Sequence, residues 1–344
     1  MQEGQRIVTE IQSAKNLVRA YQTDLEHASA DTAEAALASY LTPDTFWRGM
    51  HPFHERTGPA DIAQAFWTPL KNALTSLQRR EDIFFAGLNE VDGFSGVWVA
   101  SMGHFMGLFD APFCGIRPTR RIAMVRYAEF CKVENGKITE QAMFVDLLHL
   151  MAQTDQYPLP GMTGAMLIQP GPRTHDGLLH RTQPDGEAEG RKTLALIGAM
   201  GQSIKDASTG QALAPEEELA QHWHDDMLWW GPAGIGATHT IKRYIEQHQR
   251  PFRTKLSNRR FNGHLARIGE GNYGGFFGWP NLTLHVSGDY LGLPATDMDA
   301  DMRVVDIYRR AGDKLAENWI FIDILHFLNQ QGRDILGDLK SQAG

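Results

Sequence analysis

Two aspartates in matching surroundings are the residues of this sequence best suited to acid/base chemistry. Asp146 ends the segment Glu140–Asp146, and Asp323 ends the similar segment Glu317–Asp323. Alternation along a strand places aromatic residues on the same face as each carboxyl group, namely Phe144, Trp319 and Phe321. An apolar site disfavours a charged carboxylate and raises its pKa towards the range useful for a general acid or base. The alternative, a carboxylate bonded to a backbone amide or an arginine, stays open.

Two histidines and two further carboxylates recur at matched positions. His104 and His285 each lie three residues before a glycine within a strand-like segment, and either could share a proton transfer or bind a carbonyl group. The alternative is a core histidine with one bonded nitrogen. Glu129 and Asp306 each precede the final aspartate by 17 residues (146−129, 323−306), across a predicted hairpin. They could complete a carboxylate pair, or form ordinary pairs with arginine.

These recurrences indicate that a whole domain has been duplicated. Three blocks of residues repeat in the same order with nearly one offset, of 182, 181 and 177 positions. The pairs include Trp47 and Trp229 (229−47 = 182), Trp98 and Trp279 (279−98 = 181), and Asp146 and Asp323 (323−146 = 177). A period this long is far above the 20–50 residues of solenoids and propellers. These four tryptophans are candidates to line a binding pocket, although most large aromatic residues belong to the core.

The elements that must position these residues follow one order, helices first and strands afterwards. In the first copy the predicted helices span residues 7–21, 30–41 and 61–77, and the predicted strands span 45–47, 83–88, 94–106, 121–133 and 137–148. Asn135-Gly136 is a strong signal for a tight hairpin, and Ala311–Asp313 occupies the matching turn of the second copy. This order predicts an α+β fold, with helices packed on one face of a curved, mostly antiparallel sheet.

The length of 344 residues fits two domains. We predict domains at residues 1–156 and 190–344 and a last helix near 329–339. The segment 157–189 is rich in proline and glycine, which predicts a linker or an ordered strap across the surface. Pairing of the two domains through their sheets would make an intrachain pseudo-dimer, and a homo-oligomer of the whole chain is also compatible with the sequence.

Composition excludes several classes of partner. The formal net charge of −8 and the absence of basic runs argue against nucleic acid or an anionic membrane as a partner. The sequence has no stretch of 18 or more apolar residues and no apolar signal-peptide core, so we expect a cytoplasmic protein. Cys114 and Cys131 have Leu291 and Tyr308 as counterparts, which favours free thiols over a bridge. The clusters His51-x-x-His54 and His222-x-His224 do not recur, so we expect no metal and no cofactor.

The repeated motifs resemble SnoaL-like polyketide cyclases, of the nuclear-transport-factor-2-like superfamily. The resemblance rests on Gly103–Gly107 and Glu134–Glu140 in the first copy, and on Asp306–Arg309, Gly312–Trp319 and Leu328–Gly332 in the second. It implies two tandem cone-shaped α+β barrels of the cystatin-like type, each with an apolar pocket between sheet and helices. It also implies that an aspartate on the last strand acts as general acid/base in an intramolecular aldol ring closure. That role carries over to Asp146 and Asp323, with His104 and His285 as partners.

Two classes of function remain open. One is a cofactor-independent cyclase, lyase or isomerase that acts on a hydrophobic carbonyl compound. The other is a small-molecule binding protein of the same fold without turnover. We expect the second copy to be the more active, because it keeps Trp319 beside Asp323, whereas the first copy has Ala142 at the matching position. On this reading Asp323→Asn abolishes most of the activity and Asp146→Asn leaves most of it.

Overall fold

A computed structural model describes residues 2–207 and 213–342, and their contacts divide the chain into two compact units. Unit 1 comprises Met1–Pro158, Arg173–Thr182 and Asp323–Gly344, and unit 2 comprises Leu159–Pro172 and Gln183–Ile322. The two units therefore follow the two copies closely, except that the chain after the last strand of the second copy packs within unit 1. No helix among the described residues is long and apolar enough to cross a membrane.

Unit 1 consists of one sheet with helices on one face. Its elements before the linker are α1 (Gln2–His27), α2 (Ala33–Tyr40), β1 (Leu41–Gly49), β2 (His54–Thr57), α3 (Gly58–Ile62), the π-helix η1 (Ala63–Trp67), α4 (Thr68–Ala73), β3 (Leu74–Leu88), the 3₁₀ turn η2 (Glu90–Asp92), β4 (Val97–Phe109), β5 (Ile122–Glu134), β6 (Lys137–Val145) and α5 (Leu147–Gln153). After the last strand of unit 2 come α10 (Ile324–Asn329) and α11 (Ile335–Gln342).

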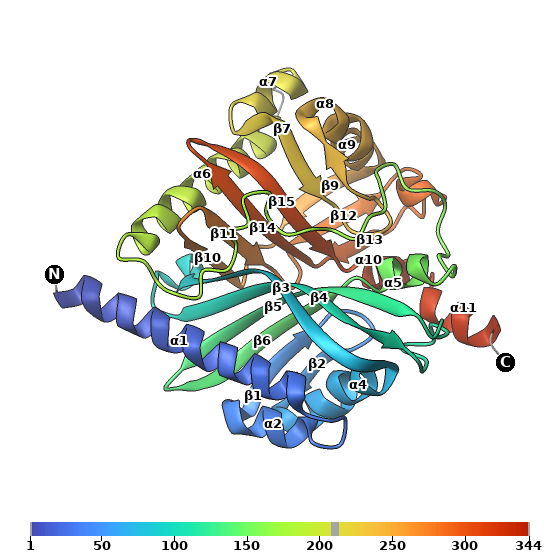
Figure 1. Ribbon diagram of the computed structural model, residues 1–344. Helices are drawn as coiled ribbons and strands as arrows, with labels where there is room; N and C mark the ends of the chain where they lie inside the picture. The colour runs from blue at the N-terminus through green and yellow to red at the C-terminus, as the bar shows by residue number, and fades with distance from the viewer. Residues whose placement is uncertain (1, 208–212, 343–344) are drawn as a thin grey trace. The chain divides into compact units, whose positions relative to one another are not determined.

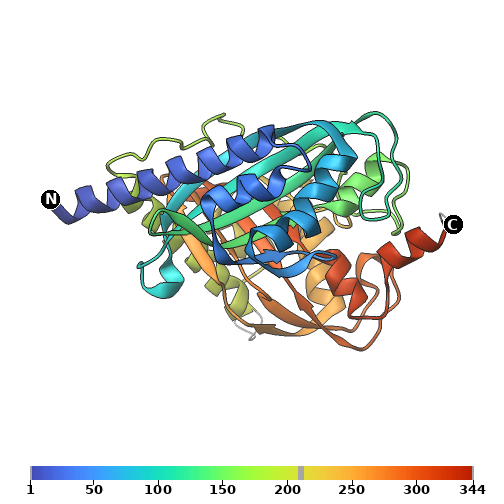
Figure 2. The ribbon, with the colours of Figure 1, turned by 90° about the horizontal axis from the view of Figure 1, so that it is seen from below.

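The long helix α1 covers β3 and β4, as both ribbon views show (Figures 1 and 2). Its buried residues recur every three or four positions, the spacing of a single apolar helix face: Ile11, Ala14, Val18, Tyr21 and Leu25. The sheet has the order β2-β1-β6-β5-β4-β3, in which β1 runs parallel to β6 and all other neighbours are antiparallel. The predicted fold of helices on a mostly antiparallel sheet is thus confirmed. The sheet is open, with β2 and β3 at its edges, and is not a closed barrel.

Unit 2 repeats this plan with shorter strands. Its elements are α6 (Gly186–Ala207), α7 (Pro215–Ala220), β7 (Trp223–Trp230), β8 (Thr238–His239), α8 (Thr240–Tyr244), the π-helix η3 (Ile245–Gln249), α9 (Arg250–Lys255), β9 (Leu256–Phe261), β10 (Ala266–Glu270), β11 (Tyr273–Phe277), β12 (Leu282–Val286), the 3₁₀ turn η4 (Tyr290–Gly292), β13 (Asp299–Met302), β14 (Val304–Ala311) and β15 (Lys314–Ile322). Helix α6 packs on β10 and β11, as α1 packs on β3 and β4.

The larger sheet of unit 2 has the order β8-β7-β15-β14-β11-β10, which matches the first sheet strand for strand. The long strands β3 and β4 of unit 1 are each represented by two short strands in unit 2, β9 with β10 and β11 with β12. The breaks fall at Gly263, where φ is +107°, and at Trp279-Pro280, which directly follows β11. As a result β9, β12 and β13 form a separate three-stranded sheet.

The predicted linker is ordered and serves both units. Residues 173–182 pack on unit 1, where Phe84 N donates to Gly177 O at 2.8 Å and Leu179 N donates to Phe84 O at 2.8 Å. In unit 2, Ala165 exchanges backbone hydrogen bonds with Ala237 at 2.7 and 2.8 Å. The segment thus covers part of the edge strand β3 in one unit and the chain next to the edge strand β8 in the other. Covering an edge in this way protects it from pairing with another chain.

Several element boundaries differ from the sequence-based expectation. The last strand of the first copy ends at Val145, and a helix follows from Leu147, where the sequence predicted strand up to residue 148. Helix α6 begins at Gly186, within the predicted linker. The predicted turn at Asn135-Gly136 is confirmed, and both residues have positive φ, as a tight hairpin of this kind requires.

Candidate functional site

The two final aspartates cap short helices. Asp146 Oδ1 accepts a hydrogen bond from His149 N at 2.9 Å at the start of α5. Asp323 Oδ1 accepts one from His326 N at 3.2 Å at the start of α10, and its Oδ2 accepts another from His51 N at 2.9 Å. An aspartate at this position satisfies backbone N–H groups that have no partner within the helix.

The geometry of both aspartates is therefore that of a carboxylate bonded to backbone amides. The expectation that they end a strand was wrong, because the strands stop one residue earlier, at Val145 and Ile322. Arg126 lies close to the carboxylate of Asp146 as well: burial lowers the pKa of Arg126 to about 9, and Asp146 is the largest influence that opposes this shift. A catalytic role for Asp146 or Asp323 stays a prediction.

The two predicted histidines bind other carboxylates. His104 is buried in β4, and its Nδ1 lies 3.4 Å from Asp82 Oδ2. His285 lies on β12 in the small sheet of unit 2, where its Nδ1 lies 2.9 Å from Asp299 Oδ1. The predicted partnership of each histidine with a final aspartate is therefore not what these contacts show.

The remaining predicted site residues divide between two faces of each sheet. Register and alternation place one group on the face that the helices cover: Trp47 and Glu129 in unit 1, and Trp229 and Asp306 in unit 2. The opposite face holds Trp98, Phe144, Trp319 and Phe321. Trp319 Nε1 donates to Pro170 O at 3.0 Å, and Trp279 follows β11 and lies beneath the guanidinium group of Arg303, 3.8 Å from the ring centroid. The helix-facing side of each sheet is where carboxylates meet aromatic rings.

On the helix-facing side of the sheet, unit 1 contains a buried ion pair. Glu129 is 1% exposed and accepts hydrogen bonds from Tyr21 Oη at 2.9 Å, Gln22 Nε2 at 3.0 Å and Arg79 Nη1 at 2.8 Å. Three donors, one of them the cationic Arg79, thus satisfy the buried carboxyl group of Glu129.

Aromatic rings fill the space around this ion pair. The guanidinium carbon of Arg79 lies 4.8 to 5.7 Å from the ring centroids of Trp67, Phe105 and Tyr127, and the last two rings stack at 4.3 Å. Cation–π contacts of this kind are strongest where water is excluded. The helix-facing side of unit 1 is thus a packed core built around Arg79 and Glu129.

Unit 2 places a different carboxyl group at the matching position. Asp306 is buried on β14, and Asn318 Nδ2 donates to its Oδ1 at 2.9 Å. Burial raises the pKa of Asp306 to about 7, and hydrogen bonds from Asn318 and Tyr308 offset part of that shift. A pKa raised towards neutrality suits a side chain to both accept and return protons.

The contrast between Glu129 and Asp306 has an identifiable cause. β3 and β9 start 182 residues apart (256−74), and at this offset Phe261 is the counterpart of Arg79 (79+182). Phe261 is uncharged and 61% exposed, so the cation that pairs with Glu129 in unit 1 has no counterpart at this position in unit 2. Desolvation then dominates the pKa of Asp306.

An aromatic cluster on the helix-facing side of unit 2 reaches Asp306 through Tyr244. Trp229 stacks on His248 at 4.0 Å with an interplanar angle of 18°, and Tyr244 lies 5.7 Å from Trp229 and 5.3 Å from His248. Burial is the largest cause that raises the pKa of Tyr244, and the Asp306 carboxylate raises it further, which places these two groups within electrostatic reach. Burial also lowers the pKa of His248 to about 3, so its ring is neutral at physiological pH.

Strand alternation does not reveal these polar residues, although the offset of 182 between the copies does. It carries Ile62 to Tyr244 (62+182) and Phe66 to His248 (66+182), and the two π-helices η1 and η3 match residue for residue at the same offset. The apolar residues of unit 1 are thus replaced by a phenol and an imidazole in unit 2. The sequence feature that reveals this site is the replacement of apolar residues of the first copy by polar ones in the helices of the second copy.

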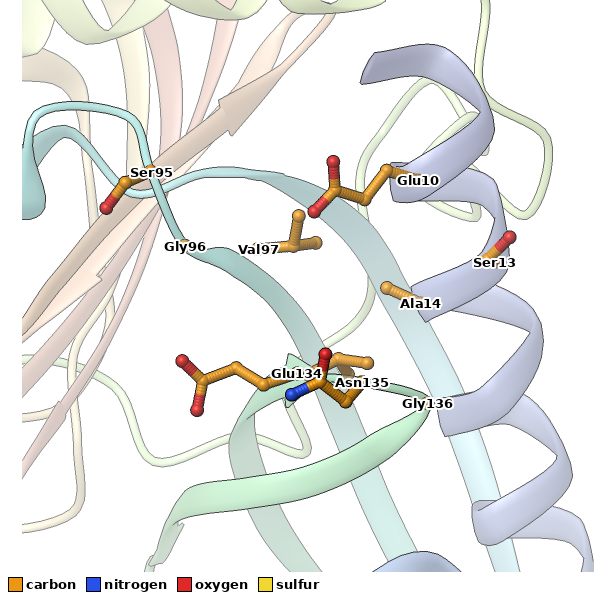
Figure 3. A pocket seen from close by; sticks show the side chains of 10 residues that line it. Glu10, Ser13, Ala14, Ser95, Gly96, Val97, Glu134, Asn135 and Gly136 are labelled. Carbon is orange, nitrogen blue, oxygen red and sulfur yellow. The ribbon is translucent and has the colours of Figure 1, made fainter. Parts of the chain in front are cut away.

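Two surface hollows lie in unit 1, and none of the predicted site residues lines either of them. One, of about 310 Å³, lies between α1 and the turns at Ser95–Val97 and Glu134–Gly136, with Glu10 and Glu134 at its border (Figure 3). The other, of about 400 Å³, is bordered by Arg117, Tyr157 and α11. Among the residues that the structure describes, no group of three or more His, Cys, Asp or Glu side chains could hold a metal ion. Both cysteines are free.

Comparison with known proteins identifies the first copy. Residues 15–154 match the family model described as SnoaL-like polyketide cyclase, the family that the motifs resemble. Unit 2 repeats its strand order. No curated protein matches the chain significantly.

Solved structures show weak similarity to single copies of the domain. An NTF2-like protein from Burkholderia xenovorans is 11% identical, with 41% of this chain and 95% of that chain covered and a TM-score of 0.33. An NTF2-like protein from Burkholderia thailandensis is 21% identical over 41% and 96%, with a TM-score of 0.31. TsrD from Streptomyces laurentii is 17% identical over 40% and 96%, with a TM-score of 0.32.

Proposed function

We propose that unit 2 carries out cofactor-independent acid/base chemistry on a hydrophobic small molecule that contains a carbonyl group, and that Asp306 is the group that moves the proton. Aldol cyclisation, isomerisation and dehydration share this step. The observation that carries the proposal is a buried carboxyl group, Asp306, which Asn318 holds by a hydrogen bond and whose pKa burial raises to about 7. The family of the first copy supports the substrate class, since polyketide cyclases act on carbonyl compounds.

The proposed step needs no oxidant or added group. The Asp306 carboxylate accepts a proton from the carbon next to the carbonyl group, the electron pair of that C–H bond forms a carbon–carbon double bond, and the oxygen becomes an enolate. The protonated carboxyl group then returns the proton to another atom of the substrate. A base with a pKa near the working pH suits both halves of this exchange.

Proton exchange on a simple ketone tests the proposal. The bicyclic ketone β-tetralone is incubated in D₂O with the protein, and loss of its α-proton signals is followed by ¹H NMR. We expect the protein to accelerate exchange, and Asp306→Asn to reduce the acceleration by roughly 10²–10⁴-fold. Asp323→Asn is the matched control, because asparagine caps a helix as well as aspartate does and the variant should stay folded. Full exchange activity in Asp306→Asn would contradict the proposal.

The alternative is a binding protein without turnover. A carboxyl group in its protonated form can also donate a hydrogen bond to a ligand oxygen without moving a proton. Saturable binding of β-tetralone with no accelerated exchange in the unmodified protein would favour that alternative.

A further inference from the structure

His248 lies in an unusual turn that the two copies share. It belongs to the π-helix η3, and Phe66 occupies the same place in η1. Single π-helical turns inside helices are rare and frequently occur at functional sites. The turn is retained in both copies while the side chain differs, so the residue type at this position distinguishes unit 2 from unit 1.

The imidazole ring of His248 is placed between aromatic residues with one nitrogen enclosed. Its Nδ1 is buried and, among the described residues, has no hydrogen-bond partner. The residue as a whole is partly exposed, and Nε2 is not among the enclosed side-chain atoms that lack a partner, so this nitrogen is the one that a ligand can reach. The ring stacks on Trp229 at 4.0 Å, and the tilted ring of Tyr244 lies 5.3 Å away.

This placement favours one form of the ring. Burial without an acidic neighbour keeps the imidazole neutral, with a pKa lowered to about 3. A neutral imidazole carries one proton, and the proton is better placed on Nε2, where a partner can reach it, than on the enclosed Nδ1, where an N–H group would stay unsatisfied. His248 therefore presents an Nε2–H donor at the accessible edge of the ring.

His248 and Asp306 are joined by a short series of contacts. Trp229, on which His248 stacks, is the register partner of Asn318 on the neighbouring parallel strand. Asn318 in turn donates to Asp306 Oδ1 at 2.9 Å. Tyr244 is near both groups, since its ring contacts His248 and its pKa responds to the Asp306 charge. Both groups therefore belong to the same side of the sheet in unit 2.

We infer that His248 binds the carbonyl oxygen of the substrate through Nε2–H and stabilises the enolate that forms when Asp306 removes the neighbouring proton. The inference rests on the proposed function. In this step the C–H bond breaks, its proton passes to Asp306, and the negative charge that develops on oxygen is held by the hydrogen bond from His248. A neutral imidazole paired with a carboxylate base is an effective combination for this chemistry, because the donor polarises the carbonyl group without protonating it.

Three variants of His248 separate a hydrogen bond from a packing role. His248→Phe installs the residue of the first copy and removes both nitrogens. His248→Gln places an amide near the position of Nε2, and His248→Asn places one near the position of Nδ1. We expect glutamine to retain the function in part and asparagine to behave like phenylalanine.

The probes are β-tetralone and its exocyclic methylene analogue, which has CH₂ in place of the carbonyl oxygen. Affinities are measured by quenching of tryptophan fluorescence. The unmodified protein should bind the ketone about tenfold more tightly than the methylene analogue, and His248→Phe should abolish this preference. The rate of α-proton exchange should fall by about 10²–10³-fold in His248→Phe, as for loss of one oxyanion donor, and by less than tenfold in His248→Gln.

The results distinguish this inference from the proposed function. An unchanged ketone preference and exchange rate in His248→Phe would overturn the inference, as would failure of the unmodified protein to bind either probe. Equal losses in the glutamine and asparagine variants would also overturn it, because they would indicate packing. Asp306→Asn should lose exchange and keep the ketone preference. If Asp306→Asn keeps exchange while His248→Phe loses the preference, the proposed function fails and oxygen binding by His248 stands.

Discussion

Replacing Asp306 with asparagine should stabilise the protein at neutral and alkaline pH. Asparagine has the same shape as the protonated carboxyl group and carries no charge. Burial raises the pKa of Asp306 from the ordinary value of 3.8 to about 7. Each pKa unit corresponds to 1.36 kcal/mol, so a shift of roughly 3 units gives a cost of about 4 kcal/mol for ionising the carboxyl group in the folded state.

The sign and the pH window follow from proton binding in the two states. Below pH 4 the carboxyl group is protonated both folded and unfolded, and it contributes no pH dependence. Between pH 4 and 7 the unfolded chain loses this proton while the folded protein keeps it, so stability falls as the pH rises. Above about pH 7 both states are ionised and the effect is constant. The stability of Asp306→Asn relative to the unmodified protein should therefore rise by about 4 kcal/mol from pH 4 to pH 8.

Urea unfolding followed by tryptophan fluorescence at a series of pH values measures this difference. His248 contributes a pH dependence of the opposite sign, since its pKa is lowered in the folded state, but that contribution is common to both proteins and cancels in the difference. A difference that does not change between pH 4 and pH 8, or one that falls, would refute the reasoning about Asp306.

Three further predictions concern other buried groups. Glu129→Gln should destabilise unit 1 by about 3–5 kcal/mol, because it leaves the buried Arg79 without its anion. In urea unfolding at neutral pH, the free energy of unfolding should therefore fall in Glu129→Gln and rise in Asp306→Asn. Asp323→Ala should lower the free energy of unfolding by about 0.5–2 kcal/mol, because it removes a helix cap. Asp323→Asn should leave both the stability and the rate of proton exchange nearly unchanged. A large loss of exchange in Asp323→Asn would support the catalytic role that the sequence suggested. Burial raises the pKa of Cys114 to about 12 and raises that of Cys131, so neither thiol should react with a disulfide reagent at pH 8 until urea is added, and rapid modification of the folded protein would contradict this placement.

The fold could be predicted from the sequence because repetition and periodicity report on it directly. The two-copy architecture, the hairpin at Asn135-Gly136 and the order of helices and strands all follow from local patterns that recur at one offset. The sequence did not reveal that the long strands of the first copy would break at Gly263 and Trp279-Pro280 in the second. Such breaks depend on how neighbouring strands pack, which periodicity does not record.

The candidate site was predicted less well, for a physical reason. Asp146 and Asp323 occur at matched positions of the two copies, which suggested a catalytic role. Such a recurrence is also explained by a structural role, because both aspartates cap short helices. Strand alternation alone does not single out Asp306, because its pKa depends on the absence of a counterpart to Arg79. It does not reveal His248 either, because this residue lies in a helical segment.

The pKa of Asp306 in the folded protein is the quantity on which the account depends most directly. The side chains of aspartate are labelled with ¹³C at the carboxyl carbon, and the chemical shifts are followed by NMR from pH 3 to pH 9, with Asp306→Asn used to assign the signal that disappears. The account predicts that this carboxyl group titrates with a midpoint near 7. A midpoint near the ordinary value of 3.8 would show that Asp306 is charged throughout the physiological range and would contradict its proposed role in proton transfer.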